Sequence, residues 1–361
     1  MIPLDRPLTP EDLRFNPPSF PAEELLDVAS KRFGVTGRLA PLEGERDQNH
    51  RLTTDEGRQF VLKVSGPTED PTVVDFQIQA LLHLERTDPG LPVPRVQRTL
   101  EGTTSDEIRG EDGTRHLVRL LSYLPGVPYE RGPAPSLEGL RAIGAFQACM
   151  CRALCSFSHP AARHFMPWDV SNGLVFNASL WRNAGSDVRD LARGFGTDAR
   201  RRVLPALAQL RAQVIHNDCH TANLLRPDET AEEIVGLIDF GDMVHAPLVQ
   251  DLAASIAGFV EGRAAPIEVA CALVAGFHEV LPLQDAELAL LHELVLLRLV
   301  LTALLFDFRL ATQPRPPAFL RETRPAILAA LRALIALDRE TMTRRYREAC
   351  TMARETRDPR T

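Results

Sequence analysis

The chain has 361 residues, 44% hydrophobic and 25% charged, a composition typical of a globular protein long enough for two domains or lobes. Its formal net charge of -7 argues against a nucleic-acid partner and is compatible with a cationic small-molecule substrate. The most apolar stretch, residues 288–306, is interrupted by Glu293 and Arg298, so it predicts a buried core helix and no membrane partner. Residues 1–10 lack the basic region and apolar run of a signal peptide, which favours a cytoplasmic location.

The first third of the chain predicts a small β-rich part. Residues 1–20 are rich in proline and polar groups and are expected to run over the surface. The segments that follow show strand-like apolar runs or helical spacing, and Asp55-Glu56-Gly57 is a turn signal. The expected elements are a helix at 22–33, strands at 51–54 and 59–64, a helix at 71–84 and a strand at 116–123. We expect these strands to pair mostly in antiparallel fashion.

Helices dominate the chain after about residue 135. The expected helices are at 137–157, at 186–193, at 199–212 and over almost everything from 248 to the end, with one short β-rich island at 214–240. The sequence therefore predicts an α+β protein with a small N-terminal antiparallel lobe, residues 1–124, and a larger helical lobe, residues 125–361. A cleft is expected between the two lobes, which join near residues 122–128.

The β-rich island contains the pattern H-x-D-x4-N at His216, Asp218 and Asn223, and a D-F-G sequence follows at Asp239. Phosphoryl transfer from a nucleotide needs a carboxylate at the attacking hydroxyl and oxygen ligands for the magnesium ion on the phosphates. Asp218 is therefore the expected base or hydroxyl-orienting residue, with Asn223 and Asp239 as metal ligands. His216 is expected to maintain the shape of this catalytic loop. Solvated turns are the alternative interpretation, but the joint order and spacing favour kinase chemistry.

Lys63 is one of only two lysines in the chain, and it lies within an apolar strand. Kinases cover the nucleotide with a loop between two strands and place a lysine on the following strand. Residues 44–49 are the matching loop here, although they lack G-x-G-x-x-G. The candidate nucleotide contacts are Lys63, Gln48, Asn49, Gln77, Ser122 and Leu124. In this interpretation the N-terminal lobe binds the nucleotide, and the C-terminal lobe carries the catalytic loop and the substrate site.

These motifs resemble the aminoglycoside phosphotransferase and choline kinase superfamily over roughly residues 25–310. Residues 45–49, residues 120–126 and the segment from His159-Pro160 to Trp168-Asp169 look most like the hydroxylysine kinase branch. The resemblance implies a protein-kinase-like fold, Mg2+ as the metal ion, and ATP or GTP as the phosphate donor. It also implies phosphorylation of an amino alcohol or hydroxy amino acid, with 5-hydroxylysine as the first candidate.

The chain departs from the superfamily pattern at two positions. Kinases usually pair the strand lysine with a glutamate on the next helix, whereas the best-aligned residue here is Gln77, with Asp75 nearby. A neutral amide would hold Lys63 less firmly than a carboxylate. Asn217 precedes Asp218 where glycine is common, and asparagine tolerates the left-handed conformation.

Several polar residues are candidates for binding the substrate or supporting the loop. An acidic residue beside an aromatic ring suits an ammonium group, so Trp168 and Asp169 are substrate candidates, with a packed Trp and a capping Asp as the alternative. Glu293 would bind a cationic substrate or form a buried ion pair. The softer candidates are His220 for the substrate, Asp242 for substrate, metal or helix capping, and Asp251 as a brace of the catalytic loop or a helix cap.

Other functions remain open at this stage. An aminoglycoside kinase would favour a strongly acidic C-terminal lobe, and the acidic residues after 255 spread around the helix faces. Homoserine- and choline-type kinases share the core motifs. A nucleotide-binding pseudokinase is favoured slightly by Gln77, but the metal ligands and base are all present. A protein kinase is disfavoured because residues 242–247 leave little platform for a peptide. The sequence leaves the oligomeric state open.

Overall fold

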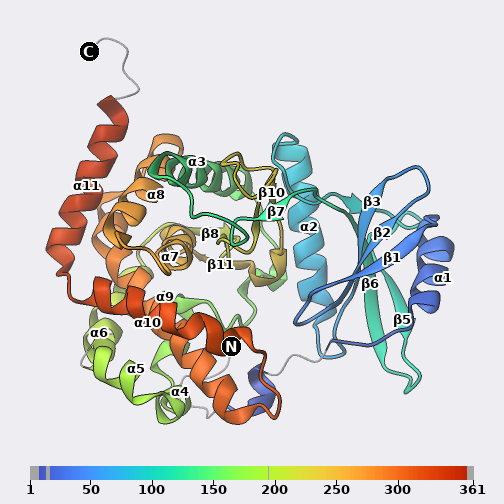
Figure 1. Ribbon diagram of the computed structural model, residues 1–361, viewed down its shortest axis with the longest axis horizontal. Coiled ribbons are helices and arrows are strands. Elements are labelled where there is room, and N and C mark those ends of the chain that lie inside the picture. Colours follow the sequence, from blue (N-terminus) through green and yellow to red (C-terminus); the bar gives the residue numbers. More distant parts are fainter. Residues whose placement is uncertain (1–7, 14–16, 194, 356–361) are drawn as a thin grey trace.

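The structure is a computed structural model that describes residues 8–13, 17–193 and 195–355. Figure 1 shows two lobes. The smaller lobe contains a β-sheet with α1 (Ala22–Phe33) and α2 (Pro71–Thr87), the larger lobe is mostly helical, and α2 lies beside the boundary between them. The predicted α+β arrangement, with a small antiparallel lobe before a larger helical lobe, is confirmed.

The sheet of the small lobe is antiparallel, in the order β1-β2-β3-β6-β4, with β5 also paired to β6. Its strands are β1 (Arg38–Leu42), β2 (Gln48–Thr53), β3 (Gln59–Val64), β4 (Val96–Gln97), β5 (Asp106–Arg109) and β6 (Arg115–Ser122). Successive side chains of a strand point to opposite faces, so Leu62 and Val64 are buried while Lys63 between them faces the other side. Helix α1 (Ala22–Phe33) closes the buried face with Leu25.

The larger lobe is built from helices around a few short strands. The helices are α3 (Leu137–Leu154), α4 (Ala178–Asn183), α5 (Ser186–Leu191), α6 (Phe195–Leu207), α7 (Leu248–Phe259), α8 (Pro266–Val280), α9 (Asp285–Thr312), α10 (Phe319–Ile335) and α11 (Arg339–Glu355). The strands are β7 (Val127–Pro128), β8 (Ala212–Ile215), β9 (Leu224–Arg226), β10 (Gly236–Leu237) and β11 (Val244–Pro247). Pairing of β8 with β11, and of β9 with β7 and β10, places the loop of residues 216–223 between two small sheets.

Helices α3 and α8 pack with their backbones almost in contact. A Cβ atom on Gly276 would lie 1.8 Å from the carbonyl oxygen of Arg141, and one on Gly144 would lie 2.1 Å from that of Leu273. Since no side chain fits in this space, glycine at both positions allows the close approach.

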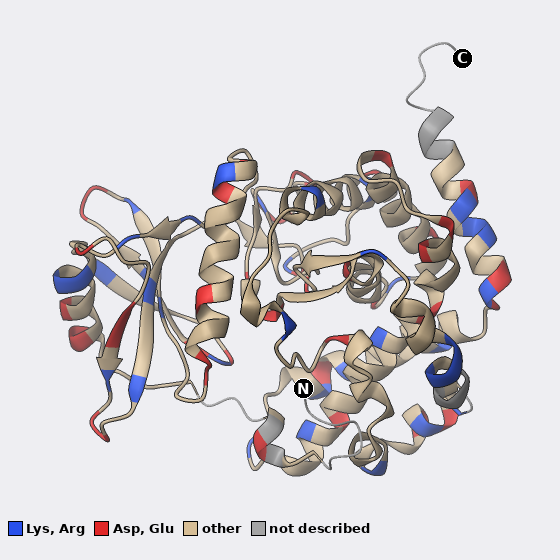
Figure 2. Cartoon of the chain, turned by 180° about the vertical axis from the view of Figure 1, so that it is seen from behind, with Lys and Arg blue, Asp and Glu red and all other residues tan. Residues whose placement is uncertain are grey.

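Helix α9 is the central helix of the larger lobe. It is the one helix among the described residues that is long and apolar enough to span a membrane, and 89% of its apolar window is buried inside the protein. The predicted core helix at 288–306 is therefore confirmed. On the outside of the lobe, α11 packs buried Met342 and Tyr346 inward, and its exposed Arg347 pairs with Asp285 at 3.1 Å. Figure 2 shows both basic and acidic residues along this outer helix.

The structure differs from the predicted elements in several places. The helix expected at 199–212 begins at Phe195 and ends at Leu207, because residues 212–215 form β8. The short helix α4 and the strands β1, β4, β5, β7 and β11 were not predicted. Residues 8–13, expected on the surface, pack into the helical lobe, although they fall within the predicted N-terminal lobe; residues 1–7 and 14–16 lie outside the described part.

The anchoring of residues 8–13 rests on both burial and hydrogen bonds. Leu8 and Leu13 are buried in the core of the helical lobe. The Leu8 amide donates to Ser179 Oγ at 3.1 Å, and the Gln313 amide donates to the Leu13 carbonyl at 3.0 Å. The turn η1 (Pro10–Leu13) accordingly lies among the larger lobe's helices in Figure 1.

Candidate active site

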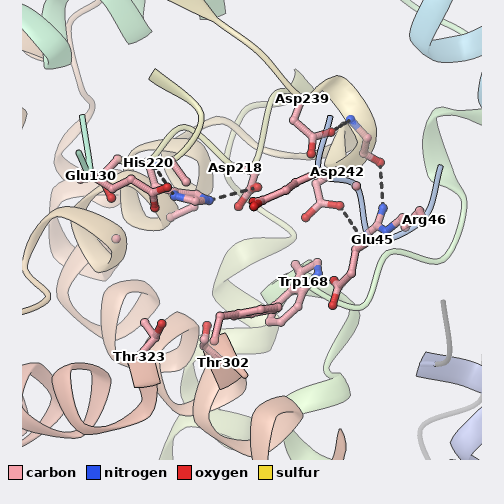
Figure 3. Close-up of a pocket in the computed structure, with 18 of the residues that line it drawn as sticks. Glu45, Arg46, Glu130, Trp168, Asp218, His220, Asp239, Asp242, Thr302 and Thr323 are labelled. Atoms are coloured by element: carbon pink, nitrogen blue, oxygen red, sulfur yellow. Dashed lines mark hydrogen bonds and ion pairs between the residues drawn. The ribbon is translucent and has the colours of Figure 1, made fainter. Parts of the chain in front are cut away.

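A pocket of about 540 Å³ lies between the two lobes. Figure 3 shows that side chains from both lobes point into it. Its walls come from the loop between β1 and β2, from the catalytic loop after β8, from the turn η5 (Phe240–Asp242) and from helices α9 and α10. Half of the site residues singled out in the sequence line this pocket, although they come from distant parts of the chain.

Buried groups hold the catalytic loop in place. Asn217 has a φ of 65°, the left-handed conformation that asparagine tolerates better than most residues. Its amide donates a 2.6 Å hydrogen bond to Asp251 Oδ1, so Asp251 at the start of α7 braces the loop and does not cap the helix. His216 accepts from the Asp218 amide at 3.3 Å and packs edge-on against Phe240, with ring centroids 4.8 Å apart. Burial lowers the pKa of His216, which favours the neutral ring.

Asp218 is surrounded by three donors. Asn223 Nδ2 donates to its Oδ2 at 2.8 Å, His220 Nε2 lies 3.3 Å from the same oxygen, and Arg298 Nη2 donates to Oδ1 at 3.1 Å. Burial alone would raise the pKa of Asp218, but the charges of His220 and Arg298 hold it well below its ordinary value. The carboxylate is therefore ionised at neutral pH. The sequence placed Arg298 in a buried helix but did not predict its contact with Asp218.

Asn223 and Asp239 lie on adjacent segments, because the Ile238 amide donates to the Asn223 carbonyl at 2.9 Å. Asp239 has a φ of 60°, and its Oδ1 accepts from the Gly241 amide at 3.1 Å. The Asn223 amide nitrogen faces Asp218, so its donors are used there and its oxygen is left for another partner. One carboxylate and one amide oxygen beside a pocket suit Mg2+, which is commonly held by one or two carboxylates together with substrate phosphates.

The loop between β1 and β2 reaches across the pocket to the helical lobe. Arg46 pairs with Asp242 at 2.7 Å and donates to the Gly241 carbonyl at 3.3 Å. Glu45 pairs with Arg309 of α9. Figure 3 shows Glu45 and Arg46 pointing from the loop toward this far wall. Burial raises the pKa of Asp242 to about 6, and Arg46 opposes that rise. We call residues 45–46 and their two partners the interlobe latch.

Lys63 pairs with a residue that was not predicted. Its Nζ lies 3.4 Å from Asp47 Oδ2, and Arg119 donates to the same oxygen at 3.0 Å. Burial tends to raise the pKa of Asp47, but Lys63 and Arg119 lower it below the ordinary value. Gln77 accepts from Arg119 at 3.2 Å, so it supports the arginine and not Lys63. The carboxylate expected on the helix is thus supplied by the loop.

Other predicted nucleotide contacts divide into pocket and non-pocket residues. Asn49 stands opposite Lys63 in the β2–β3 register and lines the pocket. The neighbouring Gln48 points the other way and bonds to the backbone of Phe20 at 2.8 and 2.9 Å, which corrects its predicted role. Ser122 accepts from the Arg95 amide at 2.8 Å, and neither Ser122 nor Leu124 lines the pocket walls described above.

Two predicted substrate residues are also corrected. Asp169 is buried, accepts from the Ser171 amide and from Gln250, and caps the turn η3 (Val170–Asn172). Glu293 is only 3% exposed and pairs with Arg202. It lies five residues before Arg298 on α9, about 140° around the helix from the residue that faces the pocket. Its side chain therefore belongs to the buried ion pair that was the alternative.

Trp168, His220 and Asp242 do line the pocket. Arg298 covers the Trp168 ring at 5.6 Å and donates to the Trp168 carbonyl at 2.7 Å, so this ring supports an arginine of the protein itself. The pocket carboxylates that the sequence did not single out include Glu130 and Glu261. Neither belongs to a motif, and only the folding of α7 against the catalytic loop brings Glu261 to the site.

Comparisons with known proteins agree with this geometry. The model of the phosphotransferase enzyme family matches residues 38–283. Hydroxylysine kinase of Danio rerio is 29% identical over 94% of this chain and 98% of its own length. Among solved structures, an amicoumacin kinase in complex with AMP-PNP, Ca2+ and Ami has a TM-score of 0.67 at 15% identity, covering 90% of this chain and 97% of that one. A microcompartment-associated aminopropanol kinase has a TM-score of 0.67 at 19% identity, covering 91% and 98%.

Proposed function

The chain belongs to the phosphotransferase enzyme family and acts on hydroxyl groups, and from this premise we propose that its acceptor is a small amino alcohol or hydroxy amino acid. 5-Hydroxylysine is the first substrate to test, and the proposed donor is ATP or GTP with Mg2+. The observation that carries the proposal is the ionised Asp218 between Asn223 and Arg298 in a pocket that also contains Asp239 and Lys63. The near full-length match to a hydroxylysine kinase supports the choice of acceptor.

In the proposed reaction Asp218 accepts a hydrogen bond from the acceptor hydroxyl and aims its oxygen at the phosphate. Asn223 and Arg298 fix the carboxylate by bonding one oxygen each. Because the pKa of Asp218 is low, the proton is transferred late, when the oxygen–phosphorus bond has begun to form. The acceptor oxygen then bonds to phosphorus, the nucleoside diphosphate leaves, and the hydroxyl proton passes to Asp218.

Three cationic side chains gather on the phosphate side of the pocket, each beside a carboxylate. Lys63 and Arg119 flank Asp47 on the sheet, and Arg46 approaches from the loop. A compact ammonium such as that of Lys63 suits a single phosphate contact. Asn223 and Asp239 would hold Mg2+, which neutralises charge on the phosphates when it is bound. We therefore propose that the small lobe holds the nucleotide and the helical lobe holds the acceptor.

The proposal is tested by a turnover assay with 5-hydroxylysine, Mg2+ and either ATP or GTP. We expect phosphate transfer that EDTA abolishes. Asp218→Asn should lower kcat by about 100- to 10,000-fold with nucleotide binding nearly unchanged. Asp27→Asn, on the exposed face of α1, is the matched control and should behave as wild type. Turnover that survives Asp218→Asn, or no transfer to any amino alcohol with either nucleotide, contradicts the proposal.

A further inference from the structure

Glu261 lines the acceptor side of the pocket, just after the end of α7. One turn earlier, Gly258 lies so close to the catalytic loop that a Cβ atom there would be 2.6 Å from that of His220. This contact presses the end of α7 against the loop that carries Asp218. Among the described residues, none donates a hydrogen bond to the Glu261 carboxylate or forms an ion pair with it.

Glu261 and Asp218 share the same two cationic neighbours. His220 and Arg298 both contact Asp218, at 3.3 and 3.1 Å. The same two side chains are the charges that act on Glu261, and both are already engaged by Asp218. Burial therefore dominates at Glu261 and raises its pKa to about 7. A half-buried carboxylate in this situation would be stabilised by a further cation entering the pocket.

We propose that Glu261 binds an ammonium group of the acceptor, and that this ammonium lies on the carbon next to the one bearing the reacting hydroxyl. The inference rests on the proposed function and defines its substrate class as vicinal amino alcohols. The charge of His220 acts on both carboxylates, and Figure 3 shows His220 beside Asp218. A hydroxyl bonded to Asp218 and an ammonium bonded to Glu261 are thus a short distance apart. Longer spacers would push the ammonium past Glu261.

The test compares a homologous series of acceptors. We measure kcat and KM for 1-amino-2-propanol, 3-amino-1-propanol, 4-amino-1-butanol and 1,2-propanediol, whose second group is neutral. Wild type should favour the vicinal amine over the diol by about 10- to 100-fold in kcat/KM, as expected for a charged hydrogen bond. Efficiency should fall as the spacer lengthens.

Glu261→Gln keeps the shape and removes the charge. It should raise KM for the vicinal amine about 10- to 100-fold while leaving KM for the nucleotide and the kinetics of the diol unchanged. Glu261→Asp should restore part of the amine preference. Glu268→Gln, an exposed residue of α8, is the control and should have no effect.

Each alternative outcome overturns the inference in a recognisable way. Equal losses for amine and diol would make Glu261 a structural residue. A selective loss in Glu130→Gln instead would assign the ammonium to Glu130. Equal use of all spacers would remove the vicinal requirement while the proposed function stands. If wild type phosphorylates none of these amines, the inference fails, and the proposed function fails with it only when 5-hydroxylysine is not phosphorylated either.

Discussion

Arg298 connects two parts of the pocket, the catalytic loop and the segment of Trp168. It donates to Asp218 on one side and to the Trp168 carbonyl on the other, and its guanidinium covers the Trp168 ring. A planar, permanently charged group can make these contacts together, whereas a lysine could supply only a point charge. Arg298 therefore fixes the orientation of Asp218 and keeps it ionised, which suits a residue that orients a hydroxyl more than one that removes its proton early.

The elevated pKa of Glu261, about 7, predicts a pH dependence of acceptor binding. Below pH 7 Glu261 gains a proton and no longer attracts an ammonium group, so KM for an amino alcohol should rise as the pH falls, by up to about tenfold per unit. Its other charged neighbours are His220, Arg298 and, beyond them, Asp218. Protonation of His220 would act in the same direction. KM measured from pH 5.5 to 8.5 checks this, and the dependence should flatten in Glu261→Gln. A KM that falls toward acid pH would contradict the assignment.

At the scale of elements, the packing of α3 on α8 sets the frame that holds α7 and the catalytic loop. Gln147 of α3 donates to the Asp251 carbonyl at 2.8 Å, and Cys151 one turn later donates to the Asp251 carboxylate at 3.3 Å. Asp251 in turn holds the Asn217 amide. The position of α3 is therefore transmitted to the catalytic loop through the buried carboxylate of Asp251, whose pKa burial raises.

Gly276→Ala should separate α3 from α8. The new methyl group would lie 1.8 Å from the Arg141 carbonyl oxygen, so the helices must move apart. Overpacking of this kind costs about 1–3 kcal/mol, which should be visible as a lower Tm. Gly90→Ala is the matched control, because its Cβ would meet only the Asp88 side chain at an ordinary 3.4 Å. An unchanged Tm for Gly276→Ala would show that the interface is looser than the structure has it.

At the scale of the whole molecule, the interlobe latch joins the lobes across the pocket. Arg309 is 3% exposed and Glu45 is about a third exposed, so this pair is screened less by salt than a surface pair. The second pair, Arg46 with Asp242, lies directly beside the expected metal ligand Asp239. We expect a bound nucleotide with its metal ion to compete with Asp242 for Arg46.

Glu45→Gln should loosen this loop without removing a phosphate-binding residue. We expect hydrogen exchange at the backbone amides of residues 43–47 to become about tenfold faster. This corresponds to a decrease of about 1.4 kcal/mol in the free energy needed to open the loop. Glu43→Gln, on the same loop but without a recorded ion pair among the described residues, is the control. Equal exchange in both variants would mean that the Glu45–Arg309 pair does not hold the loop.

Features that depend on neighbouring residues in the sequence were predicted, whereas features that depend on contacts between distant residues were not. The helix at 22–33, the strand of Lys63 and the catalytic loop are local patterns, and they lie where they were expected. The partner of Lys63 is set by how a loop folds back over the sheet, so Asp47 could not be told from Gln77. Gln48 and Asn49 are neighbours on one strand, and only the register decides which of them faces the pocket.

The anchoring of residues 8–13 has a mechanical consequence. Among the described residues, two parts of the chain connect the lobes. Leu8 is bonded to the helical lobe and Phe20 to Gln48 of the sheet, and the chain leaves the sheet after Ser122 to form β7. In Figure 1 the anchored turn η1 lies near the lower edge of the molecule, and β7 lies higher up, near its middle. Two connections restrict the motion of the small lobe to rotation about one axis, whereas a single connection would allow rotation about any axis. We therefore expect the small lobe to rotate about the line that joins these two connections. Such a rotation would open the acceptor pocket while Lys63 continues to face Asp218.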